Sequence, residues 1–261
     1  MLEAGCPMKN SSSKNRIFTI ISVLFLLGLW KLGAWAIDSE LILPSPEETA
    51  LAVINLFREK EFLRIISATI LRGLIGFGIS FLLAVILGIA AGMNQAFNAF
   101  LRPILVTIRS TPVISLILLA LIWFDVGQVP VFIALLTMFP FICTNIIEGI
   151  QHVDQKLIVM AKVYRIQTSS IIRDIYLPAT TPFIFSGVSS AMGFGWRAII
   201  IGEVLSQPQY GIGTFMQNAQ TYLLVDKVIA WTVVAIALSY LFDHGIRFIE
   251  KQTLTWKKSS S

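Results

Sequence analysis

Two arginines and one glutamate interrupt long apolar stretches of this sequence: Arg109, Arg197 and Glu203. A charged side chain among apolar residues is costly, so it usually faces protein interior or water and meets an opposite charge. Arg197 directly follows Trp196, and an arginine beside an aromatic ring can hold an anion or a planar ring. These residues therefore predict reversible binding of a small anionic or planar solute.

Each of these positions also has a structural interpretation. Arg109 could reach the lipid headgroups or form an ion pair, and Arg197 could pair with Glu203 or contact a second subunit. Asn145 could cap or cross-link helices, and Arg72, near the end of an apolar run, is expected to be an interfacial anchor. The residues that we consider for a solute pathway are Arg109, Thr111, Asn145, Trp196, Arg197 and Glu203.

The sequence lacks the usual patterns for catalysis and metal binding. It contains no Walker motif, no HExxH motif and no recognisable catalytic triad. Cys6 and Cys143 have no partner pattern, and Cys143 is expected to be a small packing residue. We therefore predict that the chain is not an enzyme, holds no metal or cofactor and cannot hydrolyse ATP by itself.

The elements that position these residues are apolar runs of membrane-spanning length. Hydrophobic residues make up 56% of the 261 residues and charged residues 13%, against about 25% charged in an ordinary soluble domain. A span needs about 20 apolar residues, and backbone groups in lipid must be bonded within a helix. The sequence therefore predicts an all-α integral membrane protein with about six transmembrane helices. The runs are residues 17–37, 67–93, 104–124, 129–148, 183–202 and 228–249.

The distribution of lysine and arginine predicts the orientation of the spans. With six spans both termini face one side, and the segments on that side are rich in these residues. The segments on the other side contain Arg58, Lys60, Arg64 and Lys227. Because cytoplasmic segments carry the excess of positive charge, both termini and residues 152–178 are expected to be cytoplasmic. The expected division is a tail at 1–16, a transmembrane domain at 17–250 and a tail at 251–261.

Local patterns predict how the helices pack and where they start or break. Small residues recur every four positions from Gly76 to Gly92 and again from Gly187 to Gly195, which predicts close helix packing. Residues 45–48, with a serine three positions before a glutamate, predict a capping box that opens an amphipathic interfacial helix. After Pro112 only about 12 apolar residues follow, roughly 18 Å of helix, so the third span must include residues 109–111 or be broken there.

A basic segment, residues 152–178, connects the fourth and fifth runs and keeps a helical pattern. Helices are expected over 154–163 and 171–175 with a break at 167–170. Pro178 and Pro182 are expected to stop helix propagation before the fifth span. The segment is too apolar and too close to the membrane for a DNA-binding helix–turn–helix, so no nucleic-acid partner is expected. A connection this long, basic and ordered predicts a docking element for a partner.

This segment and the motifs around it resemble a known family. Residues 161–165 followed by 175–178 resemble the cytoplasmic EAA loop of bacterial ABC importer permeases, although Val159, Met160 and Arg165 stand where that loop has Glu, Ala and Gly. Over about residues 20–250 the chain resembles the nitrate/sulfonate/taurine-type permeases. The matching positions are 43–46, 101–103, 109–112, 123–124, 139–140, Asn145, Gly149, Trp196, Glu203 and 211–213.

The resemblance implies a type I ABC importer in the bacterial inner membrane, with two permease chains forming the pore. Two cytoplasmic ATPase subunits, carrying ATP and Mg²⁺, would dock on this chain, and an extracytoplasmic binding protein would deliver the solute. The implied solute is a sulfonate- or nitrate-type anion or a vitamin-precursor heterocycle. The alternative is a secondary transporter or channel without ATPase partners. The implied coupling residues are Ala161, Lys162, Val163, Tyr164, Arg165 and Ile166.

Overall fold

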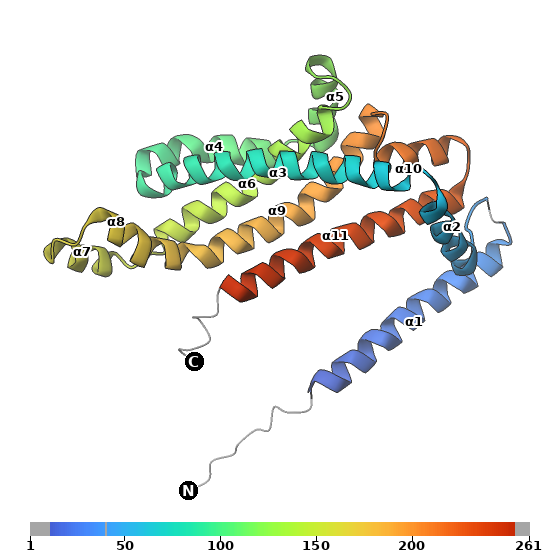
Figure 1. The fold of residues 1–261 in the computed structure, drawn as a ribbon, viewed down its shortest axis with the longest axis horizontal. Helices are drawn as coiled ribbons and strands as arrows, with labels where there is room; N and C mark the ends of the chain where they lie inside the picture. Colours follow the sequence, from blue (N-terminus) through green and yellow to red (C-terminus); the bar gives the residue numbers. More distant parts are fainter. Residues whose placement is uncertain (1–10, 40, 254–261) are drawn as a thin grey trace, which may run out of the picture.

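The computed structural model describes residues 11–39 and 41–253, and every regular element in these ranges is a helix (Figure 1). Five segments are long and apolar enough to cross a membrane, and the bent pair α4–α5 makes a sixth if it counts as one span. This agrees with the predicted all-α membrane protein. The helices are α1 (Ser11–Ile37), α2 (Pro46–Arg58), α3 (Phe62–Met93), α4 (Gln95–Ser110), α5 (Val113–Trp123), α6 (Val129–Gln151), α7 (Gln155–Val163), α8 (Thr168–Ile171), the π-helical turn η1 (Ile172–Tyr176), α9 (Leu177–Ser206), α10 (Ile212–Thr221) and α11 (Val225–Thr253).

The centre of the bundle is α6, which packs along both α3 and α9. The small residues of α3 and α9 make these contacts possible. A Cβ atom added to Gly76 would lie 2.5 Å from the Cβ of Ala134, and one added to Gly195 would lie 2.0 Å from the Cε of Met138. Cys143 is buried in the same core. The predicted role of the two stripes in close helix packing is therefore confirmed.

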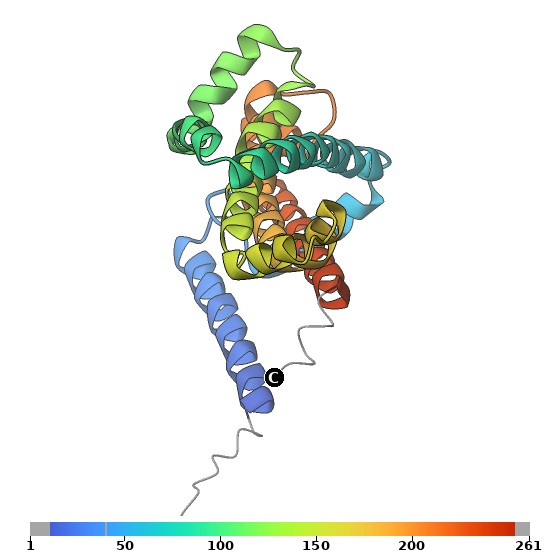
Figure 2. The ribbon, with the colours of Figure 1, turned by 90° about the vertical axis from the view of Figure 1, so that its left-hand side faces the viewer.

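Helix α1 stands apart from the bundle in two perpendicular views (Figures 1 and 2) and packs lightly against α2. The indole N–H of Trp30 donates to the Pro44 carbonyl at 3.1 Å, just before α2 begins. The predicted capping box is present, because Ser45 and Glu48 each accept from the backbone of the other. Helix α2 then packs on α11 through its buried residue Leu56.

The third predicted span is broken rather than straight. Helices α4 and α5 meet at an angle of 97°. Thr111 is extended, with ψ of 130°, and Pro112 follows it. A proline disfavours the helical conformation in the residue before it and has no N–H to continue the helix. Arg109 consequently lies in the last turn of α4, at the bend.

The expectation that Pro178 and Pro182 stop the helix before the fifth span is wrong. Residues Thr168–Ser206 form one continuous helical segment, with Pro178 in the first turn of α9 and Pro182 inside it. The π-helical turn η1 immediately precedes α9. This wider turn lies where Pro178 has no N–H to donate, and Thr180 Oγ1 donates to the Tyr176 carbonyl at 2.8 Å. The last part of the basic segment 152–178 is therefore helically continuous with the fifth span.

Candidate functional site

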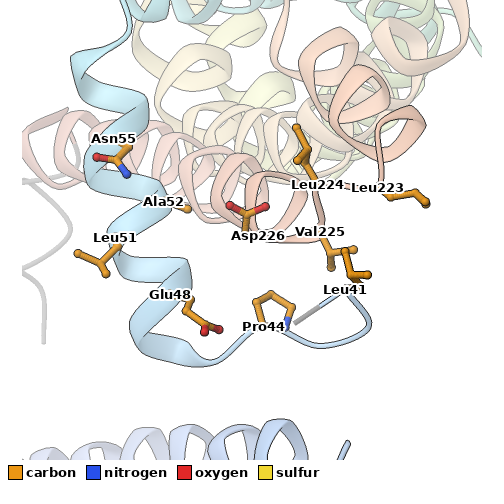
Figure 3. Close-up of a pocket in the computed structure, with 10 residues that line it drawn as sticks. All are labelled: Leu41, Pro44, Glu48, Leu51, Ala52, Asn55, Leu223, Leu224, Val225 and Asp226. Atoms are coloured by element: carbon orange, nitrogen blue, oxygen red, sulfur yellow. The ribbon is translucent and has the colours of Figure 1, made fainter. Parts of the chain in front are cut away.

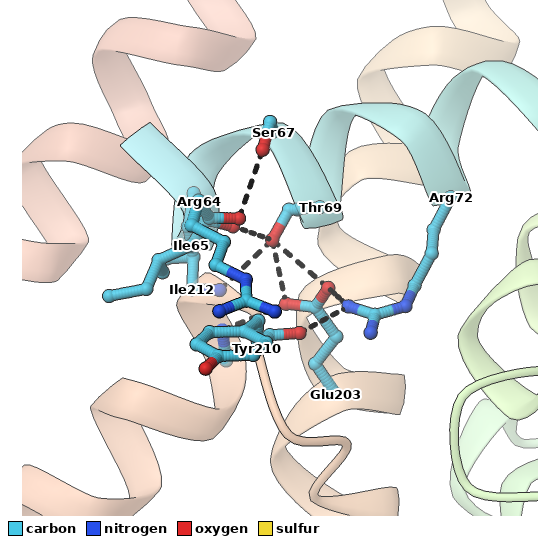
Figure 4. A network of polar contacts seen from close by, with 9 residues as sticks. Arg64, Ile65, Ser67, Thr69, Arg72, Glu203, Tyr210 and Ile212 are labelled. Carbon is cyan, nitrogen blue, oxygen red and sulfur yellow. Dashed lines mark hydrogen bonds and ion pairs between the residues drawn. The ribbon is translucent and has the colours of Figure 1, made fainter. Parts of the chain in front are cut away.

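The charged residues within the spans form a buried, paired group and an exposed group. Figure 4 shows the buried group, centred on the fully buried carboxylate of Glu203 in α9. Arg72 Nη1 donates to Glu203 at 2.7 Å, and the Gly213 amide donates to it at 3.0 Å. Thr69 Oγ1 lies 3.0 Å from both carboxylate oxygens, and Arg72 also donates to the Tyr210 carbonyl at 2.6 Å. These bonds tie α3, α9 and the start of α10 together.

Arg72, and not Arg197, is therefore the partner of Glu203, and the suggested pairing within α9 is wrong. Arg197 and Glu203 are six residues apart, and at about 100° of rotation per residue they project from different sides of the helix. The expectation that Arg72 is an interfacial anchor is also wrong, because its guanidinium turns inward to a buried carboxylate. This group holds the fold together and presents no open binding surface.

Arg109 belongs to the exposed group and lies in a stack of three side chains from α4, α6 and α9. Its guanidinium carbon is 4.9 Å from the centre of the Phe141 ring. Phe141 in turn stacks on Phe194, with 4.8 Å between ring centres and 6° between planes. A guanidinium held over a ring keeps its N–H groups available at the edge. None of the ion pairs among the described residues includes Arg109, so these groups can meet an anion.

Arg197 lies three residues after Phe194 and is also exposed and outside the described ion pairs. It borders a groove of about 580 Å³ between α9 and α11, together with Trp196 and Asp243. Asp243 bonds Arg247 at 2.8 Å instead. Trp196 is buried, and its indole N–H has no hydrogen-bond partner among the described residues. The groove thus combines a cation with an aromatic ring.

The other two residues considered for the pathway bond within their own helices. Thr111 Oγ1 donates to the Thr107 carbonyl at 2.8 Å at the end of α4. Asn145 Nδ2 donates to the Phe141 carbonyl at 2.9 Å, one turn earlier in α6. Asn145 therefore lies beside the stacked rings. The structure brings Arg109 and the two phenylalanines together, places Asn145 one turn along α6 from Phe141, and leaves the Glu203 group separate.

Residues 152–178, which include α7 and α8, form a compact hook at one end of the bundle (Figure 1). Asp154 caps α7 by accepting from the Lys156 amide at 2.8 Å. The end of α7 is a left-handed turn, with Arg165 at φ of 53° and the Ile166 amide donating to the Ala161 carbonyl at 3.0 Å. This geometry usually selects glycine, so the turn typical of the EAA loop persists with arginine.

Within the hook, Ala161 is buried against α8, whereas the side chains around the turn point outward. Val163 and Tyr164 are 73% and 74% exposed. Lys162, Arg165 and Ile166 are exposed as well. The exposed end of the hook therefore carries both apolar and basic side chains, and the buried residues beneath it are well packed. Such a surface can insert into a groove of another protein.

The end of the bundle opposite the hook has a different charge character. Figure 3 shows a pocket of about 380 Å³ there, between α2 and the start of α11. Glu48 and Asp226 line it, together with the apolar residues Leu41, Leu51 and Leu223. The pocket lined by these carboxylates and the basic hook thus lie at opposite ends of the molecule, where Figure 1 shows α2 and α7.

The family of this chain follows from sequence comparison. Residues 80–254 match the model of the family described as binding-protein-dependent transport system inner membrane component. The match includes the bent third span, the hook and all of α9. The chain belongs to this family. It is a permease of a binding-protein-dependent ABC transporter, an inner-membrane multi-pass protein and not itself catalytic, as the resemblance implied.

Curated relatives of this permease extend the match over most of the chain. It is 31% identical over 236 residues to SsuC of Escherichia coli (strain K12), covering 88% of each chain. It is 27% identical over 237 residues to SsuC of Bacillus subtilis (strain 168), covering 90% of this chain and 85% of the relative. The names of both relatives refer to aliphatic sulfonates transport. The bicarbonate transport system permease protein CmpB of Synechococcus elongatus is 29% identical over 180 residues, 69% of this chain and 65% of that one.

Sequence reasoning missed the aromatic stack and the main buried pair. Phe141 and Phe194 are separated by more than fifty positions, and nothing in their local pattern distinguishes them from other apolar residues of the permease. Thr69 and Arg72 lie one turn apart on α3. A hydroxyl and a cation at this spacing share one face of the helix, and this pattern could have predicted that they bind a buried carboxylate.

Proposed function

We propose that this permease forms the pathway of an ATP-driven importer for a small oxyanion, with a second copy of itself and two ATPase subunits. ATP and Mg²⁺ are bound by the ATPases and not by this chain. The binding protein delivers the solute at the α2 end, and the ATPases dock at the hook. In this arrangement both termini are cytoplasmic. The described ends of α1 and α11 lie toward the hook end of the molecule (Figure 1), which supports that orientation.

The observation that carries the solute class is a pair of exposed arginines in the spans, Arg109 and Arg197, which take part in none of the ion pairs of the described residues. Arg109 is oriented by Phe141, and Arg197 follows one turn after Phe194. Exposed cations in a span without a protein partner are costly unless they face water or an anionic ligand. Guanidinium groups bind planar or tetrahedral oxyanions through two parallel N–H groups. The named relatives handle sulfonates and bicarbonate, which are oxyanions.

The polar residues of the pathway have distinct parts in this proposal. Arg109 and Arg197 meet the solute, Asn145 contributes its amide one turn from Phe141, and Trp196 contributes a groove wall beside Arg197. Thr111 holds the bend that exposes Arg109. Glu203 contributes by fixing α9 against α3 rather than by contact with the solute, because it is fully buried and bonded.

Coupling to the ATPases is the part of the proposal that one experiment tests directly. Tyr164→Asp puts a carboxylate on the exposed tip of α7, and Arg165→Glu reverses the charge beside it. Burying a polar group without a partner costs about 1–3 kcal/mol, and an isolated charge more. We expect both variants to lose the co-purifying ATPase while the permease keeps its unfolding temperature.

Tyr222→Asp is the matched control, because Tyr222 is equally exposed, at 76%, and lies at the end of α10. The control should retain a normal amount of ATPase. Retention of the ATPase by both hook variants would contradict the assignment of residues 152–178 as the coupling element.

A further inference from the structure

A pocket between α4 and α6 carries two cations that the buried network does not use. Its volume is about 360 Å³, within the range of small-ligand sites. Arg102 and Arg109 are seven residues apart, two helical turns, so both project from one side of α4 into this pocket. Asn98 precedes Arg102 by one turn and lines the same wall. One face of a single helix therefore presents three donor side chains.

The opposite wall of the pocket comes from the last turns of α6. Thr144, Glu148 and Gln151 line it at helical spacing. Glu148 is exposed, and no described ion pair includes Glu148, Arg102 or Arg109. Two guanidinium groups thus share one pocket with one carboxylate, and an excess of positive charge is left for a ligand.

The position of the pocket relates it to both the aromatic stack and the hook. Arg109 forms its inner edge, where the guanidinium lies over Phe141. Gln151 forms its outer edge and ends α6, four residues before α7 begins. A solute that passes the stack and moves toward the hook would therefore enter this pocket.

We propose that the α4–α6 pocket is an oxyanion-binding vestibule on the hook side of the solute pathway, where Arg102 and Arg109 bind the solute and Glu148 competes with it. The inference rests on the proposed function and adds a site to it. Two arginines attract the anion from the stack, and the nearby carboxylate keeps its affinity low. Weak binding at this point favours release, because a tightly held anion would block the path.

Charge-selective labelling of a cysteine tests the vestibule without any transport assay. Thr144→Cys is made in a Cys6→Ser background and purified with its ATPase subunits, since Cys143 is buried. The labelling rates with an anionic and a cationic methanethiosulfonate reagent are then compared, each relative to a free thiol. Clefts lined by one sign of charge raise local counter-ion concentration by 10-fold or more, so we expect about a tenfold preference for the anionic reagent.

Substitutions of the charged residues should move this preference in opposite directions. Arg102→Gln should bring the ratio of the two rates toward that of a free thiol, and Glu148→Gln should raise it. Asn55→Cys, in the acidic pocket of Figure 3 beside Glu48 and Asp226, is the matched control and should prefer the cationic reagent. Equal rates at position 144, or a preference for the cationic reagent, would overturn the proposal.

Gln151→Cys provides a second reporter in the same pocket, at an exposed position. Failure of the reagents to reach either position would also overturn the proposal. Methanesulfonate should slow anionic labelling equally in nanodiscs with and without phosphatidylglycerol. If phosphatidylglycerol slows the anionic labelling and methanesulfonate does not, the pocket binds a lipid headgroup, and the proposed solute vestibule is contradicted. The cysteine variants leave the hook unchanged and the labelling rates do not measure ATPase binding, so the coupling test and this test can fail separately.

Discussion

Arg72 and Arg197 take opposite roles within one bundle, and their surroundings explain the difference. Arg72 bonds a fully buried carboxylate and a backbone carbonyl. Arg197 borders an open groove, and no described ion pair includes it. The first arginine is needed for folding because its loss strands a charge. The second is available for a ligand.

Replacing each of these arginines separates stability from transport. Arg72→Met should destabilise the permease by about 3–5 kcal/mol, because it leaves Glu203 buried without its cation. Arg197→Met should leave the unfolding temperature of the purified complex unchanged and reduce solute uptake. Thermal unfolding and uptake are measured on both variants. Equal destabilisation by the two changes would contradict the distinction drawn between them.

At this scale the sequence identified the right kinds of residue but assigned a wrong partner. The cost of a charge in an apolar run is a local property, so Arg109, Arg197 and Glu203 stood out. The partner of Glu203 depends on which helix packs beside α9, and Arg72 is 131 positions away. Tertiary packing decides such pairs, so the spacing of Thr69 and Arg72 on α3 could indicate a carboxylate partner but not which residue supplies it.

The helices show how glycine positions set the spacing of the bundle. Gly76→Ala would place a methyl group 2.5 Å from the Cβ of Ala134, and the Val131 carbonyl oxygen lies 3.0 Å away. Because the Val131 carbonyl belongs to the backbone of α6, it cannot move aside easily. Overpacking of this kind costs about 1–3 kcal/mol of folding stability. Gly78→Ala, with nothing within 4 Å, is the matched control and should be neutral or slightly stabilising. The unfolding temperatures of the two variants are compared.

At the turn after α7, a change to glycine is expected to stabilise the structure. Arg165 adopts a left-handed conformation at φ of 53°, which costs a residue with a side chain roughly 1 kcal/mol. Arg165→Gly should therefore make this turn more stable. Hydrogen exchange of the Ile166 amide, which donates to Ala161 across the turn, should slow by up to about fivefold. Faster exchange in the glycine variant would show that the arginine side chain itself holds the turn.

Most elements were predictable because their causes are local. The lengths of the apolar runs, the capping box at Ser45 and the small-residue stripes each depend on neighbouring positions. The break at Pro112 was left open by the sequence, because a long span and a broken one contain the same residues. The continuation of α9 through Pro178 was mispredicted, since a π-helical turn lies where the proline has no N–H.

The whole molecule is polarised along its long axis. The acidic pocket of α2 and α11 lies at one end, and the hook lies at the other (Figure 1). The two exposed arginines and the Phe141–Phe194 stack lie on α4, α6 and α9, between these ends. In the importer that we propose, these parts are the receiving end, the pathway and the coupling end.

The measurement that tests this account most directly is uptake by vesicles that contain the purified complex. Labelled alkanesulfonate or bicarbonate is offered outside, with the binding protein present and ATP trapped inside. The account predicts accumulation above the outside concentration only when the permease, both ATPase subunits, the binding protein and ATP are all present. Accumulation by the permease without ATPase, driven by an imposed ion gradient, would contradict it and indicate a secondary transporter.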